Sequence, residues 1–164
     1  MKFVIPLLLV LFSISCISAA QEETAHKTIR INKDSFSEIY PAVWFSPSNG
    51  TIAPLTEKSE TPPKPTFKIW IEPSDPEIAT LDRKAAEEGN QGFQLIGHGE
   101  THFKNPVPPK EKKLVSRIRA EDLEKPLAVF LYVEGKKSYV MLVESLLKDE
   151  QELTFQWKAL ESNQ

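Results

Sequence analysis

The residues best suited to chemistry lie in one short stretch, Gly97-His98-Gly99-Glu100-Thr101-His102, which contains two of the chain's three histidines. If this stretch is extended, the two-residue period of a strand places His98, Glu100 and His102 on the same side. Two imidazoles and one carboxylate are the ligand set of a known class of divalent-metal sites. These three residues are therefore the candidate metal ligands. The alternative is that the two glycines form a bulge or turn and that the polar side chains are simply solvated.

No other chemical motif accompanies this stretch. The sequence lacks the Gly-x-Ser-x-Gly elbow, the phosphate-binding loop, the dinucleotide fingerprint and the His-Glu-x-x-His helix. Catalytic carboxylates can also come from distant positions, so the missing motifs do not exclude an enzyme. We predict a non-catalytic protein without a cofactor. A divalent metal bound by the His-x-Glu-x-His stretch, with or without a metal-dependent activity, is the alternative.

Trp70 is the candidate contact for a ligand or partner. Residues 66–72 alternate in character, with Phe67, Ile69 and Ile71 on one face of an expected strand. Trp70 therefore belongs to the opposite, more polar face. Exposed tryptophans are favoured at interfaces, whereas packing under a loop is the alternative, since tryptophan is usually well buried.

The elements that position these side chains follow from the hydrophobic pattern. Alternating or continuous apolar runs predict strands over residues 28–32, 42–45, 51–55, 66–72, 93–96, 114–119, 127–133, 138–147 and 153–158. Ser74-Asp75-Pro76-Glu77 has the composition of a capped helix start, and Gly89 that of a helix end, so one helix is expected over 76–88. The predicted fold is mainly β: an antiparallel β-sandwich or rolled sheet with one short helix.

One segment decides between this fold and its alternative. Residues 138–147 carry an apolar stripe that would suit a helix over 138–149, giving an α+β fold. Against a helix, Val140 and Val143 are β-branched, and Gly135 suits the loop of a hairpin. The sequence therefore favours a strand.

The N-terminus has the composition of an export signal. A basic Lys2 precedes an apolar core over residues 3–12, and small residues lead to Ala20. Cleavage near Ala20 gives a signal peptide over 1–20, a flexible N-terminus over 21–27 and a single β-rich domain over 28–160.

Cys16 offers a different N-terminus. It is the chain's single cysteine and occupies the place where a bacterial lipoprotein carries its acylated residue. Ser13-Ile14-Ser15 lacks the leucine that usually begins such a motif, so lipidation is the alternative to cleavage near Ala20. Only lipidation of Cys16 would place the protein at a membrane.

The amino-acid composition limits both the cellular compartment and the class of partner that we expect. Cleavage near Ala20 removes the one cysteine, and the absence of disulfides favours a bacterial periplasm or cell exterior. The net charge is −3, and the basic stretch 110–119 is interrupted by Glu111 and has no interleaved aromatic residues, which argues against nucleic acid. We predict a secreted or periplasmic binding or interaction module of the cell envelope. Its expected partner is an envelope protein or a polysaccharide.

Overall fold

The computed structural model describes residues 26–56, 66–80, 82–107, 109–111 and 113–160. The predicted signal peptide, its cleavage site and Cys16 lie outside these residues. Lys27, the last residue of the predicted flexible N-terminus, already belongs to the first strand. No helix within the described ranges is long and apolar enough to cross a membrane.

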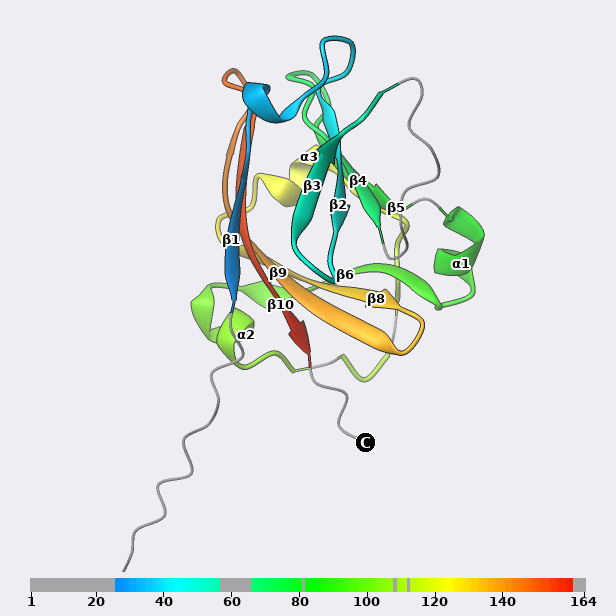
Figure 1. The fold of residues 1–164 in the computed structure, drawn as a ribbon. Helices are drawn as coiled ribbons and strands as arrows, with labels where there is room; N and C mark the ends of the chain where they lie inside the picture. The colour runs from blue at the N-terminus through cyan, green and yellow to red at the C-terminus, as the bar shows by residue number, and fades with distance from the viewer. Residues whose placement is uncertain (1–25, 57–65, 81, 108, 112, 161–164) are drawn as a thin grey trace, which may run out of the picture.

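Two five-stranded antiparallel sheets make up the fold (Figure 1). Sheet A contains, in spatial order, β1 (Lys27–Ile31), β10 (Glu152–Leu160), β9 (Lys137–Leu147), β8 (Ala128–Glu134) and β6 (Gln91–His98). Sheet B contains β3 (Thr51–Pro54), β2 (Ala42–Ser46), β4 (Phe67–Trp70), β5 (Glu77–Thr80) and β7 (Arg117–Ile118). The predicted mainly β, antiparallel, sandwich-like fold is confirmed.

Residues 138–147, which distinguish the β fold from the α+β alternative, form a strand. β8 and β9 pair in antiparallel register from Val129 with Leu142 to Glu134 with Lys137. Gly135 in the connecting turn has a φ of +57°, a left-handed conformation that glycine adopts without a steric penalty. The alternative helix over 138–149 is therefore wrong.

The predicted helix over 76–88 is wrong in its first half. Residues Glu77–Thr80 form β5, because Ile78 pairs with Ile69 of β4 and with Ile118 of β7. The helix, α1, covers only Arg83–Glu87, and the Asp82 side chain caps it by accepting a hydrogen bond from the Ala85 N–H at 3.0 Å. Burial of Ile78 between two strands outweighs the local capping pattern further upstream.

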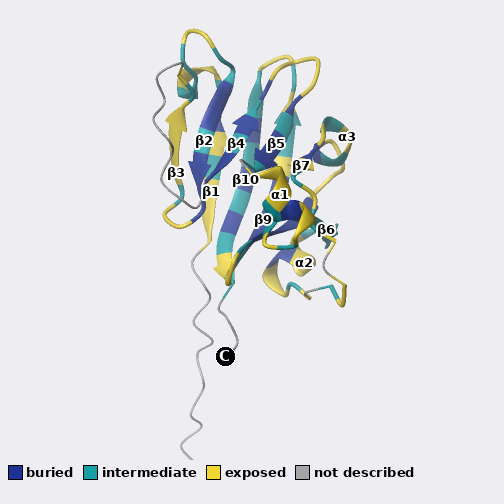
Figure 2. Cartoon of the chain, turned by 90° about the vertical axis from the view of Figure 1, so that its right-hand side faces the viewer, coloured by how far each residue is buried: buried dark blue, intermediate teal, exposed yellow. Residues whose placement is uncertain are grey.

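The remaining helices are short. α2 covers Glu100–Lys104, α3 covers Ala120–Leu123, and a 3-10 turn covers Lys33–Ser35. Neither α2 nor α3 has a side-chain cap, although both have acidic residues in the first turn, which the helix dipole favours. Figure 2 shows that the strands carry most of the buried residues, whereas the edge strand β3 is exposed along its length.

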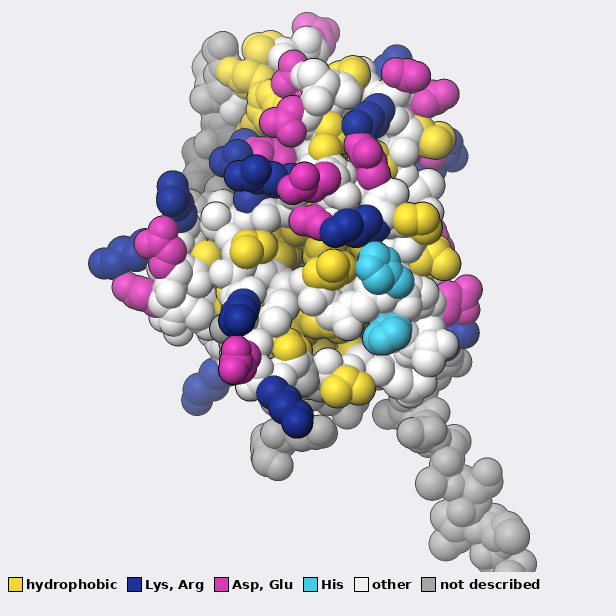
Figure 3. All heavy atoms as spheres, turned by 180° about the vertical axis from the view of Figure 1, so that it is seen from behind, with side chains coloured by type: hydrophobic (Ala, Val, Ile, Leu, Met, Phe, Trp, Pro, Cys, Tyr) yellow, Lys and Arg dark blue, Asp and Glu magenta, His cyan; other side chains and the backbone are white. Residues whose placement is uncertain are grey.

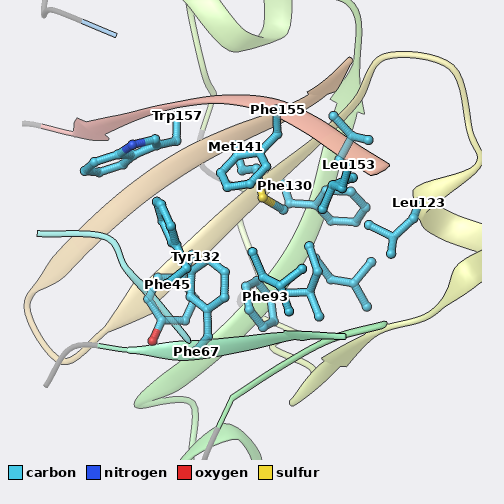
Figure 4. Close-up of a cluster of buried hydrophobic side chains, with 14 of the residues drawn as sticks. Phe45, Phe67, Phe93, Leu123, Phe130, Tyr132, Met141, Leu153, Phe155 and Trp157 are labelled. Atoms are coloured by element: carbon cyan, nitrogen blue, oxygen red, sulfur yellow. The ribbon is translucent and has the colours of Figure 1, made fainter. Parts of the chain in front are cut away.

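Aromatic side chains from both sheets fill the space between them (Figure 4). Phe45 of β2 lies 5.1 Å from Phe67 and 5.2 Å from Phe155, measured between ring centroids. Tyr132 of β8 lies 5.0 Å from Phe67 and 4.9 Å from Phe93. These tilted and edge-on contacts add to the free energy gained by burying the rings, and together they hold the two sheets against each other.

A second, smaller core lies on the opposite face of sheet A. There Phe103 of α2 packs with residues of β8 and β9, namely Val129, Leu131, Val133, Val140 and Leu142. β8 is therefore buried on both faces, which explains why its sequence is apolar throughout rather than alternating.

Candidate functional site

The three predicted metal ligands do not lie on one strand. β6 ends at His98, Gly99 has a φ of +85°, and α2 begins at Glu100. The extended geometry assumed from the sequence is wrong, because the left-handed glycine breaks the strand and the helical period replaces the period of two. Glu100 instead forms an ion pair with Lys104, one turn along α2, at 3.0 Å.

Both histidines of this segment are held through Nδ1. His102 Nδ1 lies 2.7 Å from the carbonyl oxygen of His98, and His98 Nδ1 lies 3.3 Å from the carbonyl oxygen of Pro126. A carbonyl can only accept, so a hydrogen bond at either position requires the hydrogen on Nδ1. That tautomer leaves the lone pair of Nε2 available to a metal. Within the described ranges, however, no group of three His, Cys, Asp or Glu side chains could hold an ion.

Hydrophobic residues surround the histidine segment. The Gly99 N–H donates to the carbonyl oxygen of Leu127 at 2.8 Å, and Leu127 has a φ of +49° and a side chain that is 41% exposed. Leu95 of β6 is 38% exposed. Figure 3 shows hydrophobic side chains gathered beside two histidine side chains on this face of the molecule. The segment is thus an ordinary mixed surface on which two imidazoles are anchored.

Trp70 lies on the outer face of sheet B, as the alternation of its strand predicts. Its neighbours in the chain, Ile69 and Ile71, are buried in the core between the sheets, so the half-buried indole points the other way. Its Nε1–H donates to Glu72 Oε2 at 3.2 Å. The ring of Tyr40 lies 6.0 Å from the Trp70 ring at an angle of 50°.

Charged side chains continue this surface across sheet B. Lys68 Nζ lies 4.9 Å from the centroid of the Trp70 ring, a cation–π distance. Glu77 of β5 forms two ion pairs. Its Oε1 lies 3.8 Å from Lys68 Nζ, and its Oε2 lies 3.0 Å from Arg117 Nη1. We define the Trp70 surface as Tyr40, Lys68, Trp70, Glu72, Glu77 and Arg117.

Strand pairing assembles the Trp70 surface from distant parts of the chain. Trp70 pairs with Ala42 of β2 and with Glu77 of β5, and Arg117 comes from β7. The sequence indicated Trp70 alone. Tyr40, Glu77 and Arg117 carry no local signal, because only the strand order of sheet B brings them together. Recognising β5 as the partner of β4 would have pointed to Glu77, but not to Tyr40 or Arg117, which lie outside these two strands.

Between the two sheets, the described residues enclose a cavity of about 10 Å³ that is lined by aromatic and aliphatic side chains. This volume is close to the lower limit for one water molecule. Tyr132, which lines it, accepts a hydrogen bond from Gln91 Nε2 at 2.9 Å, and burial raises the pKa of its hydroxyl well above the ordinary value.

Comparison with protein-family models, curated proteins and solved structures finds no match to this chain.

Proposed function

We propose that this protein is a non-catalytic binding module of the cell exterior or envelope, and that it binds its partner through the Trp70 surface. The observation that carries the proposal is the position of the Trp70 indole, which faces outward from sheet B with Tyr40 and Lys68 against it. Aromatic side chains of this kind supply large contact areas and have few rotatable bonds.

The contacts around Trp70 support binding rather than simple exposure. Glu72 holds the indole N–H, Lys68 covers part of one ring face, and Tyr40 packs alongside. A side chain that is already immobilised loses little conformational entropy when a partner docks. The Trp70 surface is thus preorganised.

The proposed location outside the cytoplasm requires that the protein be exported. The charged, apolar and small-residue pattern of residues 1–20 supports cleavage near Ala20, and acylation of Cys16 is the alternative. Mass spectrometry of the protein recovered from the cells that produce it distinguishes the two. We expect Gln21 as the first residue, whereas a lipid-modified Cys16 would show a membrane-tethered protein.

A sedimentation assay with insoluble envelope material tests the binding proposal. We expect the wild-type protein to sediment with this material, and Trp70→Ala to lower the apparent affinity about tenfold or more, as for the loss of a central aromatic contact. Trp70→Phe, which keeps a ring in place, should retain part of the binding. Val107→Ala, at an exposed position outside the Trp70 surface, is the control. Equal sedimentation of all four proteins would refute the proposal.

Metal binding by His98 and His102 is the second candidate function. The observation in its favour is that both Nδ1 atoms meet backbone carbonyls, which leaves both Nε2 atoms able to ligate. Elemental analysis of the purified protein, with His98→Ala as the comparison, tests it. A stoichiometric metal that disappears in the variant would establish the site, and metal-free wild-type protein would dispose of it.

A further inference from the structure

We propose that the ligand of the Trp70 surface is an uncharged polysaccharide. This inference rests on the proposed function and names the chemical class of the partner. A sugar ring presents C–H groups on its faces and hydroxyl groups around its edge. Its binding site therefore needs an aromatic face beside groups that donate and accept hydrogen bonds.

The aromatic part of the site is the pair Trp70 and Tyr40. The faces of aromatic rings carry a partial negative charge, which attracts the weakly positive C–H groups of a sugar. Lys68 already uses this property, since its ammonium group lies 4.9 Å from the Trp70 ring centroid. Tyr40 widens the aromatic area on one side of Trp70, with 6.0 Å between the ring centroids.

The charges of the surface point to an uncharged ligand. Lys68 and Arg117 are balanced by Glu72 and Glu77, and Glu77 contacts both basic side chains. A polyanion would meet basic side chains whose charge Glu77 already offsets, and the carboxylates of Glu72 and Glu77 would repel it. An apolar partner would bury these ion pairs and lose their hydration without compensation.

A ligand that binds through hydroxyl groups is neither repelled by the carboxylates nor forced to bury the ion pairs without hydrogen bonds. A carboxylate has about four lone-pair positions and a guanidinium has five N–H donors. Each group can therefore keep its ion pair and still bond to a hydroxyl. The exposed Arg117 side chain and the second oxygen of Glu72 are positioned for such contacts, since only one Glu72 oxygen receives the Trp70 N–H.

The extent of the surface indicates a chain rather than a single sugar. From Trp70 on β4 to Arg117 on β7 the surface crosses two strand spacings, or about 10 Å. Tyr40 extends it in the other direction, toward β2. A linear polysaccharide lying across the strands would contact the rings at one end and the ion pairs at the other.

Native gel electrophoresis through gels containing soluble polysaccharides tests this proposal. The probes are two neutral polymers, a β-glucan and a mannan, and one acidic polymer, polygalacturonate. We expect at least one neutral polymer to retard the wild-type protein, with no weakening as salt is raised. Trp70→Ala should lose about tenfold or more in apparent affinity, and Val107→Ala should behave as wild type.

Glu77→Gln provides a matched test of the charge argument. This variant frees Lys68 and Arg117 from their shared partner, so it should gain retardation by polygalacturonate that weakens as salt is raised. No such gain would contradict the claim that Glu77 keeps the surface neutral.

The other outcomes separate this inference from the proposed function. If neither neutral polymer retards the wild-type protein, or if only polygalacturonate does, the uncharged polysaccharide is wrong. Trp70-dependent sedimentation with envelope material would then leave the binding module standing with a ligand of another class. Equal retardation of wild type and Trp70→Ala would overturn the assignment of the site itself.

Discussion

Trp157 is a buried core residue with both a favourable and an unfavourable contribution to stability. Its indole is 7% exposed and packs 5.5 Å from Tyr139 and 5.6 Å from Phe45. Its Nε1–H has no hydrogen-bond partner among the described residues. Burying an unpaired donor costs free energy, whereas burying the ring gains it, so the two parts of the side chain act in opposite directions.

Substitution at Trp157 separates these two contributions. Trp157→Phe removes the unpaired donor and keeps most of the ring contacts, so we expect it to change the free energy of unfolding by less than about 1.5 kcal/mol. Trp157→Ala should cost about 3–5 kcal/mol, because it leaves a large cavity. Urea unfolding measures both. Equal losses would mean that the indole N–H is not the unfavourable group.

Tyr132 makes stability sensitive to alkaline pH. Burial is the main reason that the pKa of Tyr132 is raised, and nearby Glu134 adds to the effect, while the Gln91 hydrogen bond opposes it. An unfolded tyrosine titrates near pH 10. Above about that pH the unfolded chain loses a proton that the native Tyr132 keeps, so the free energy of unfolding falls.

Tyr132→Phe tests this dependence. The variant should show a smaller decline in the free energy of unfolding above about pH 10. Below that pH it should differ from wild type only by a constant amount, from loss of the Gln91 hydrogen bond. Urea unfolding across this pH range provides the measurement. Parallel curves for the two proteins would show that Tyr132 titrates normally in the native state.

At the scale of elements, Gly92 fixes how β6 meets the segment before β7. Phe93 and Val115 exchange two backbone hydrogen bonds, at 2.9 and 2.8 Å. A Cβ at position 92 would lie 2.8 Å from the Val115 carbonyl oxygen and 3.0 Å from Leu114 Cβ. Backbone atoms cannot move aside as a flexible side chain can, so this position requires glycine.

Gly92→Ala should therefore destabilise the protein by about 1–3 kcal/mol and expose the Val115 amide to faster hydrogen exchange. Gly89→Ala is the control. Gly89 has a φ of +73°, but a Cβ added there would meet no described group within 4 Å beyond its own chain neighbours. It should cost about 1 kcal/mol from its conformation alone and leave Val115 protected. Unchanged exchange at Val115 in Gly92→Ala would contradict this role.

Elements whose stability comes from their own pattern could be predicted from the sequence. The β8 and β9 hairpin combines apolar segments that contain valine and tyrosine with a glycine turn, and both features favour the observed pairing. β5 could not be predicted, because a local capping pattern precedes it and only its distant partners, β4 and β7, make it a strand.

The candidate sites also differ in whether a local sequence pattern could predict them. Alternation within β4 was enough to place Trp70 on the outer face. The shared face expected of His98, Glu100 and His102 depended on a strand that ends early, at a left-handed Gly99. Tyr40 and Arg117 belong to the Trp70 surface through sheet topology, which no local pattern encodes.

At the scale of the whole molecule, the residues that stabilise the sandwich are separate from the surface that we propose binds a partner. The aromatic core between the sheets and the second core beneath α2 bury the large apolar residues. The Trp70 surface lies on the far side of sheet B, and its ion pairs contribute little to stability because they are partly exposed. We therefore expect changes to this surface to leave the contacts of both cores in place.

The measurement that tests the central claim most directly is nuclear magnetic resonance of the ¹⁵N-labelled protein during titration with solubilised envelope material. The indole N–H of Trp70 reports on the proposed surface, and that of the buried Trp157 is the internal control. We predict that the Trp70 indole signal and the backbone amides of Tyr40 and Lys68 shift progressively, while the Trp157 signal stays in place. Shifts confined to the region around His98 and Leu127, or no shifts at all, would contradict binding through the Trp70 surface.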